Sequence, residues 1–228
     1  MKKIIFTLVF CFSLVVTSLA QIINAEQISQ DLGIPLEEFE DLKVRIVEKV
    51  DDFQRSLQDL AGRGQVSHEA KMELYKWTIR LFIGEGQPYV IRVATPYGYR
   101  EERNDAVTMQ YINSKYKKNQ KTTQPMTSYL RELIRRSEIP NYRYHQILIE
   151  AADMVRLDNF TPIGEGRFMA TAHILQHFVG YGKEGIKYQD YTQKKIEIYI
   201  NQLIIDTPDG EQKIWDIRLG NVTSDDIW

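Results

Sequence analysis

RFMATAHILQHFVGY, residues 167–181, is the stretch that decides the fold. Successive side chains of a strand point to opposite faces of a sheet, so this stretch divides into two sets with a period of two. One face carries Phe168, Ala170, Ala172, Ile174, Gln176 and Phe178. The other carries Met169, Thr171, His173, Leu175, His177 and Val179. The pattern predicts one long strand with a buried apolar face and a mixed outer face.

The same alternation predicts three further strands in the last third of the chain, over 144–155, 188–205 and 212–222. Their apolar sides are Ile147, Ile149 and Ala151; Ile196, Ile198, Ile200 and Ile204; and Trp215, Ile217 and Leu219. Their other sides are Gln146, Leu148 and Glu150; Glu197, Tyr199 and Asn201; and Asp216 and Arg218. Turn residues at 161–166, 182–185 and 207–210 join neighbouring strands by short loops, which makes the sheet an antiparallel meander.

The first half of the chain is mostly helical. Apolar residues at steps of three and four predict a helix over 36–60, and Ser67 is placed to cap a second helix whose apolar residues include Trp77. We expect this second helix to be buried on most sides and to end before the glycines of 84–88. A third helix begins after Pro125 and ends before Pro140. Two short strands are expected over 89–94 and 106–112, followed by a polar loop over 113–124.

This order of elements, with its two-faced sheet, resembles the nuclear transport factor 2-like superfamily over Leu36 to Thr223. The resemblance implies a cone-shaped α+β domain in which a helical hairpin and a short third helix pack on a curved antiparallel sheet. It also implies a pocket between helices and sheet and, in many members, a dimer through the outer sheet face. Members include isomerases, dehydratases and binding modules, so the fold alone does not choose a function. The long segment 95–124 departs from the family pattern.

The first twenty residues have the pattern of an export signal: Lys2 and Lys3, an apolar run over 4–16, and small residues at Ser18 and Ala20. The run is shorter than the roughly twenty residues that span a bilayer, so no transmembrane segment is expected after its removal. We therefore expect a signal peptide at 1–20, a flexible arm at 21–34, and one domain at 35–228 that is periplasmic or secreted. The only cysteine, Cys11, lies in the leader, and the bulky residues before it argue against a lipid anchor.

Charge and spacing exclude several kinds of site. Removal of Lys2 and Lys3 with the leader lowers the net charge from −2 to −4, which disfavours nucleic-acid binding. The basic cluster at 115–121 lies in a polar stretch and is interpreted as a solvated loop. His173 and His177 lie about 13 Å apart along one strand, too far to share a metal, and no cofactor motif is present.

The sequence favours a non-catalytic binding or assembly module of the bacterial envelope. Its expected partner is a second copy, through the outer sheet face, or an envelope protein or small ligand that the sequence does not identify. The predicted contact residues are His173, His177, Glu197, Tyr199 and Arg218, because interfaces favour interleaved aromatic and arginine side chains.

Two alternatives stay open at this point. One is an isomerase or lyase that acts on a small apolar substrate in the cone, although the predicted inner face offers Gln176 and Gln202 and few acids. The other is a polysaccharide-contacting protein with Tyr142, Tyr144 and Tyr181 as aromatic platforms.

Overall fold

The computed structural model describes residues 25–62, 66–112, 120–139, 146–152, 155–208 and 210–227. The expected signal peptide, the basic residues 115–118, Tyr142 and Tyr144 lie outside the described residues. The chain divides into two compact units, 1–44 and 45–228, and this boundary falls inside the domain expected from the sequence. Within the first unit, residues 25–32 of the predicted arm form a helix.

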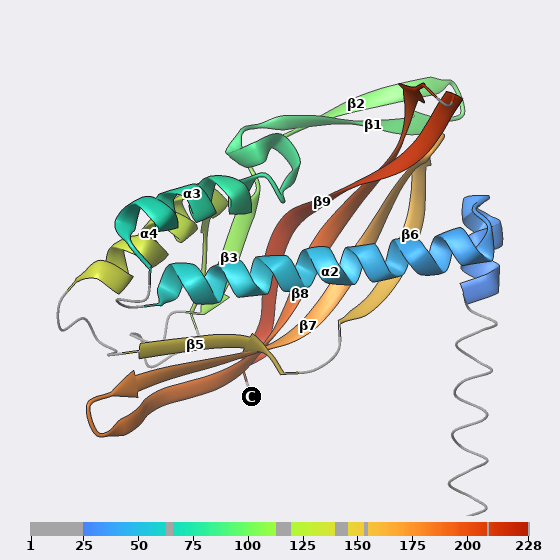
Figure 1. The fold of residues 1–228 in the computed structure, drawn as a ribbon. Helices are drawn as coiled ribbons and strands as arrows, with labels where there is room; N and C mark the ends of the chain where they lie inside the picture. Colours follow the sequence, from blue (N-terminus) through green and yellow to red (C-terminus); the bar gives the residue numbers. More distant parts are fainter. Residues whose placement is uncertain are drawn as a thin grey trace, which may run out of the picture. The chain divides into compact units, whose positions relative to one another are not determined.

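The fold is α+β, as predicted from the strand and helix patterns (Figure 1). The helices are α2 (Leu36–Ala61), α3 (His68–Ile79), α4 (Met126–Glu138) and a short 3₁₀ turn, η1 (Ile83–Gly86). The strands are β1 (Tyr89–Thr95), β2 (Gly98–Asn104), β3 (Thr108–Ile112), β4 (Lys121–Pro125), β5 (Gln146–Ala151), β6 (Arg156–Gly164), β7 (Arg167–Gly182), β8 (Gly185–Thr207) and β9 (Gly210–Ile227).

The large sheet has the order β4-β3-β9-β8-β7-β5, and β6 also pairs with β7. Its centre is the predicted antiparallel meander, in which β7 and β8 pair from Arg167↔Asn201 to Gly182↔Gly185. β8 and β9 meet at a second short loop, Thr207↔Gly210. One pairing is parallel, between β3 and β9. β1 and β2 form a separate two-stranded sheet.

The predicted inner face of β7 is confirmed. Phe168, Ala170, Ala172 and Ile174 are at most 4% exposed, and the second half of α2 lies against this face. The contact includes a hydrogen bond in which Gln176 Nε2 donates to Gln54 Oε1 at 2.9 Å. The inner residues of the neighbouring strands are buried as well: Ile196, Ile198, Ile200, Trp215, Ile217 and Leu219. A period of two therefore assigns the two faces correctly from Phe168 to Gln176. It was wrong near the end of β7, where Val179, predicted outside, is 2% exposed and Phe178, predicted inside, is half-buried.

The strand prediction was wrong at both ends of the sheet. Where we expected one strand over 144–155 and a turn over 161–166, there are two strands, β5 and β6, and β6 also takes in residues 156–160. Both pair with the same edge of β7. The sequence of β6 shows no regular alternation of apolar and polar residues, because the strand itself is irregular. Its register with β7 shifts between Asp158 and Thr161, and Asn159 has a φ of 56°. β2 lies in the segment 95–105, for which we predicted no element, and β4 lies mostly in the segment 113–124, which we expected to be a loop. Their polar sequences carry no apolar alternation, since neither strand covers the core.

The start of α3 is confirmed, and its buried face is different from the prediction. Ser67 caps the helix by accepting a hydrogen bond from the Ala70 backbone N–H at 3.2 Å. Trp77, expected in the core, is 44% exposed, whereas Lys71 and Thr78 are buried. Lys71 Nζ donates to the carbonyl of Gly62 at the end of α2 and to Ser137 Oγ of α4 at 2.6 Å. Because Lys71 is buried to bind the carbonyl at the end of α2, the buried face of α3 differs from the apolar face that hydrophobicity alone predicts.

Ile204 was predicted on the buried face and is 61% exposed, and its neighbours Leu203 and Ile205 are 43% and 39% exposed. β7 begins at Arg167 opposite Asn201, so the β8–β9 hairpin extends beyond the end of β7. This extension carries an apolar sequence away from the part of the sheet that the helices cover.

Candidate functional site

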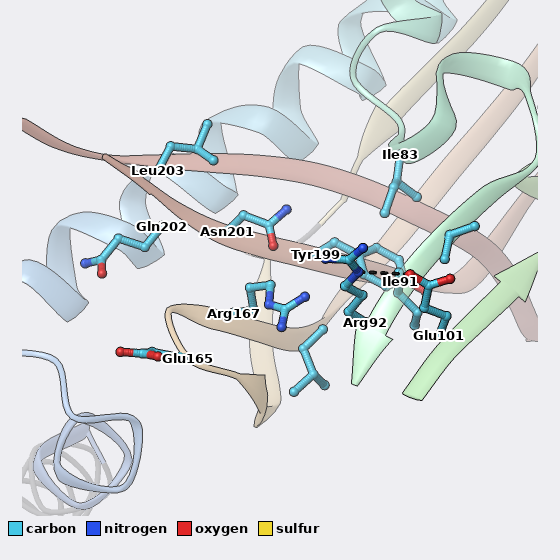
Figure 2. Close-up of a pocket in the computed structure, with 12 residues that line it drawn as sticks. Ile83, Ile91, Arg92, Glu101, Glu165, Arg167, Tyr199, Asn201, Gln202 and Leu203 are labelled. Carbon is cyan, nitrogen blue, oxygen red and sulfur yellow. Dashed lines mark hydrogen bonds and ion pairs between the residues drawn. The ribbon is translucent and has the colours of Figure 1, made fainter. Parts of the chain in front are cut away.

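A cleft of about 580 Å³ lies where the β8–β9 extension begins (Figure 2). Three segments enclose it: strand β1 with its partner β2, the turn between β6 and β7, and β8. Its lining residues are Ile83, Val90, Ile91, Arg92, Glu101, Ile163, Glu165, Arg167, Tyr199, Asn201, Gln202 and Leu203. All of them belong to the unit 45–228.

The wall formed by β1 and β2 is a hairpin with a compact turn. Thr95 pairs with Gly98, and Thr95 Oγ1 donates to the Gly98 carbonyl at 3.1 Å. The β8–β9 hairpin repeats this arrangement, because Thr207 Oγ1 donates to the Gly210 carbonyl at 2.6 Å. Both glycines have a φ near 120°, at 125° and 116°, a conformation that side-chain-bearing residues rarely adopt. The sequence Thr-Pro-x-Gly builds both turns.

The hairpin is attached to the sheet through a pair of tyrosines. The rings of Tyr89 and Tyr199 meet edge to face with centroids 5.9 Å apart, and their hydroxyl oxygens are 3.3 Å apart. Burial raises the pKa of both phenols, so both stay neutral hydrogen-bonding groups. Tyr199 is 5% exposed, because Tyr89 covers it from the outer side of the sheet.

A chain of hydrogen bonds continues this contact across the sheet. Tyr199 Oη donates to Glu197 Oε2 at 3.4 Å, and that oxygen also accepts from the backbone and side-chain nitrogens of Asn221 at 3.2 and 3.0 Å. Asn221 Oδ1 in turn accepts from the backbone N–H and hydroxyl of Thr108 on β3. Gly220 makes room for this packing, since a Cβ there would lie 2.6 Å from the Tyr199 ring.

Arg218 fixes the corner between α3 and β1. Its Nη1 donates to the Arg80 carbonyl at 2.5 Å and contacts Glu85 Oε1 at 3.3 Å, while its Nε donates to Asp216 Oδ1 at 2.9 Å. Glu85 has a φ of 49°, a strained conformation for a residue other than glycine. The arginine thus stabilises a tight corner that leads the chain into the cleft wall.

Arg167 is the charged group at the centre of the cleft (Figure 2). Its guanidinium lies over the Tyr99 ring, with Cζ 5.1 Å from the ring centroid. It also packs on Gly164, where a Cβ would lie 2.6 Å from Nη2. Among the described residues, no carboxylate or carbonyl pairs with this guanidinium, although its side chain is half-buried.

The other charges of the cleft are placed differently. Arg92 Nε contacts Glu101 Oε1 at 3.0 Å, so these two charges neutralise each other on the hairpin. Glu165 is exposed in the turn between β6 and β7. The turn is held to β8 because Gln202 donates its backbone N–H to the Gly166 carbonyl at 2.7 Å. Arg167 is therefore the cation left to meet a ligand, beside the amides of Asn201 and Gln202.

The structure separates the predicted contact residues into two groups. Glu197, Tyr199 and Arg218 lie close together next to the cleft, and Tyr199 pairs with Arg218 across β8 and β9. Tyr199 is buried by β1, so it is not an exposed contact residue as the sequence suggested. His173 and His177 lie on β7, outside the set of residues that line the cleft.

Each of the two histidines pairs with a carboxylate of a neighbouring strand. His173 Nε2 lies 3.0 Å from Asp158 Oδ1, and His177 Nδ1 lies 3.1 Å from Glu150 Oε1. His177 also stacks on Tyr191 with ring centroids 4.3 Å apart. The second ring nitrogen of each histidine is buried and has no hydrogen-bond partner in the described part of the chain.

Three residues at the cleft were not predicted as site residues: Arg167, Tyr99 and Arg92. Arg167 stands at the first position of the long strand, where we considered only the alternation that follows it. Tyr99 and Arg92 lie on the β1–β2 hairpin, which was not predicted because the sequence of β2 is polar and lacks apolar alternation. One signal was present: Thr95-Pro96-Tyr97-Gly98 repeats the turn pattern at Thr207–Gly210, which we used to predict the last hairpin.

A second cation lies at the other end of the sheet, on its inner face. Lys194 is 3% exposed, and its Nζ donates to the Gln110 carbonyl at 2.9 Å and to Ser224 Oγ at 2.5 Å. Burial lowers the pKa of Lys194 to about 7. A lysine bonded to a serine is also a nucleophile–base arrangement. Here Ser224 is 2% exposed and donates its own proton to the Gln110 carbonyl, so the contact holds three strands together.

The described residues contain no cluster of three or more His, Cys, Asp or Glu side chains that could hold a metal ion. None of the helices in the described part of the chain has the length and apolar character that a bilayer crossing requires.

Comparison with protein-family models, with curated proteins and with solved structures gives no match.

Proposed function

We propose that this protein is an exported, non-catalytic binding module and that its partner binds in the cleft between β1 and β8. The observation that carries the proposal is the half-buried guanidinium of Arg167, which has no carboxylate partner among the described residues. Burying a charge without a partner costs free energy, so a site of this kind is favoured when a ligand supplies the opposite charge. The leader over 1–20 supports export.

The arrangement of the acids favours binding over catalysis. A general base must be held within hydrogen-bond reach of its substrate. In this cleft Glu101 is ion-paired with Arg92, and Glu165 is exposed in a turn. The cleft instead combines hydrogen-bonding amides and a cation with exposed apolar side chains at its edge: Val90 is 50% and Leu203 is 43% exposed. Such a mixture is typical of recognition surfaces.

Site-specific photocrosslinking tests the proposal. A photoreactive phenylalanine analogue replaces Val90 at the cleft or, as a matched control, Ile186, which is 59% exposed in the β7–β8 hairpin. Irradiation of the cells that make the protein is expected to give a discrete adduct, by gel shift or intact mass, from position 90 only. The crosslinked protein is expected in the envelope or the medium. Adducts that are absent or equal at the two positions, or a cytoplasmic protein, would contradict the proposal.

Self-association through the outer face of β7 is a separate proposal. Of the residues predicted for this contact, His173 and His177 lie on β7. Tyr199 does not contribute, because Tyr89 of the same chain covers it.

A further inference from the structure

We propose that the ligand of the cleft is an extended acidic peptide segment, which adds as a strand along β1 and places a carboxylate on Arg167. This inference rests on the proposed function, because it names the chemistry of the partner that the cleft would bind. Two independent features support it: the open strand edges of β1 and of β8 from Leu203 onward, and a cation in the centre of the cleft.

The first open edge belongs to β1. This strand pairs with β2 along one side over seven residues, from Tyr89↔Asn104 to Thr95↔Gly98, without a register shift. Among the described residues no strand pairs with its other side. The cleft borders both this edge and one face of the hairpin, because Val90, Ile91 and Arg92 of β1 line it together with Glu101 of β2, the partner of Arg92 (Figure 2). Alternate backbone N–H and C=O groups of β1 are therefore directed toward a ligand.

The second open edge belongs to β8. Its pairing with β7 ends at Asn201, and the last backbone bond to the β6–β7 turn is made by Gln202. From Leu203 onward β8 pairs only with β9 in the described part of the chain. The cleft thus borders the open edge of β1 and reaches the start of the open edge of β8 at Leu203, and an extended peptide is the ligand whose backbone matches such edges.

Arg167 specifies the charge of the peptide. A guanidinium presents five N–H donors in a planar fork that matches a carboxylate, and it binds this group through two parallel hydrogen bonds. Stacking on Tyr99 and packing on Gly164 limit its rotamers before the ligand arrives. Pre-orientation of this kind reduces the entropy lost on binding.

Exposed apolar residues around the cleft specify the remaining side chains of the peptide. Val90, Leu203 and Ile204 are 50%, 43% and 61% exposed. Every second side chain of an added strand points the same way, so apolar residues that flank the acid at alternate positions would contact this surface. The expected ligand is a short extended segment with at least one Asp or Glu among apolar or β-branched residues.

A displayed library of random octapeptides, selected against the mature chain, tests the chemistry. The wild-type protein is expected to enrich peptides that carry Asp or Glu between apolar residues. The variant Arg167→Glu is expected to lose these peptides and to bind them at least tenfold more weakly. Arg167→Lys is expected to retain part of the affinity, because it keeps the charge without the fork. Thermal unfolding of each variant shows whether the fold is intact.

Backbone methylation of the best selected peptide tests strand addition. Methylation of amides at one parity is expected to weaken binding at least tenfold, and methylation at the other parity to leave it nearly unchanged, since only alternate N–H groups meet β1. Equal effects at both parities would overturn the strand geometry.

The outcomes distinguish this inference from the proposed function. Adducts at position 90 together with a library that enriches no acidic peptide would overturn the peptide ligand and leave a binding cleft. Soluble peptidoglycan fragments that bind in an Arg167-dependent manner, when the peptides do not, would assign the cleft to a glycan. Absence of adducts at position 90 would contradict the proposed function itself.

Discussion

Lys194 and Arg167 are two cations of the same sheet, and their surroundings differ. Lys194 lies on the inner face, 3% exposed, and donates to the Gln110 carbonyl and Ser224 Oγ. Arg167 lies at the end where β7 begins and has a tyrosine face beside it in place of an acceptor. Lys194 binds oxygens of its own chain, whereas the donors of Arg167 have no described oxygen to bind.

The difference indicates which cation serves the fold and which serves recognition. A buried polar group that meets partners of its own chain contributes to a unique arrangement of its strands. A polar group held in an open cleft without such partners contributes little to folding, and its hydrogen bonds are available to a ligand. Substitutions at the two positions should therefore separate stability from binding.

Charge reversal gives the largest expected effect. Lys194→Glu would place a buried carboxylate against the Gln110 carbonyl, and we expect a loss of about 4 kcal/mol or more in the free energy of unfolding. Arg167→Glu, the matched control, is expected to cost less than about 1 kcal/mol because this side chain loses the Tyr99 contact and no hydrogen bond. Urea denaturation of the two variants measures both values. Equal losses would show that Arg167 is also a structural cation.

The pH dependence of stability gives a smaller effect. The pKa of Lys194 is about 7 in the folded chain and 10.5 for an ordinary lysine, so between these values the unfolded state binds more protons. The free energy of unfolding therefore rises with pH across this window, by about 2 kcal/mol from pH 7 to 9. Lys71, whose pKa burial also lowers, acts in the same direction.

Lys194→Met isolates the contribution of Lys194, since the variant keeps Lys71. Denaturation midpoints at pH 7, 8 and 9 should rise more steeply for the wild type than for the variant. Parallel curves would mean that Lys194 titrates near its ordinary pKa.

Gly220→Ala gives the smallest of the three effects. It tests the packing of Tyr199, which supports β1 beside the cleft that contains Arg167. The added methyl would lie 2.6 Å from Tyr199 and 2.8 Å from Glu197 Cβ, so the tyrosine that supports β1 must shift. We expect a loss of about 1–2 kcal/mol, typical of overpacking. Gly182→Ala is the control, because its nearest neighbour would be 3.7 Å away. Thermal unfolding compares the two variants. Similar midpoints would indicate that the Tyr199 ring can shift without a loss of stability.

The central fold could be predicted because its signals are local. The alternation in β7, the Thr-Pro-x-Gly turn before β9 and the cap at Ser67 each depend on neighbouring residues. β2, β4 and β6 could not be predicted in this way. They pair at the margins of the structure, where polar or irregular sequences form strands because a partner is present and not because one face is buried.

The site was harder to predict for a related reason. Period two placed Glu197, Tyr199 and Arg218 on one face, and they do lie together. It did not show that Tyr89 covers that face, since the covering hairpin comes from a segment more than a hundred positions earlier in the chain. Arg167 is a candidate ligand-binding residue because no described carboxylate or carbonyl accepts a hydrogen bond from its guanidinium. The absence of an acceptor is a property of the folded chain, and no pattern in the sequence indicates it.

The divided outer border of β7 has a consequence for how this chain behaves at high concentration. That border is occupied by two short strands, β5 and β6, and the second is interrupted by two register shifts and by Pro162. Short, bulged and proline-bearing edges resist the strand-to-strand stacking that leads to aggregation. The edge of β1 has no bulge and no proline, so it is open to pairing with another copy of the chain. A peptide bound along this edge would therefore also reduce aggregation.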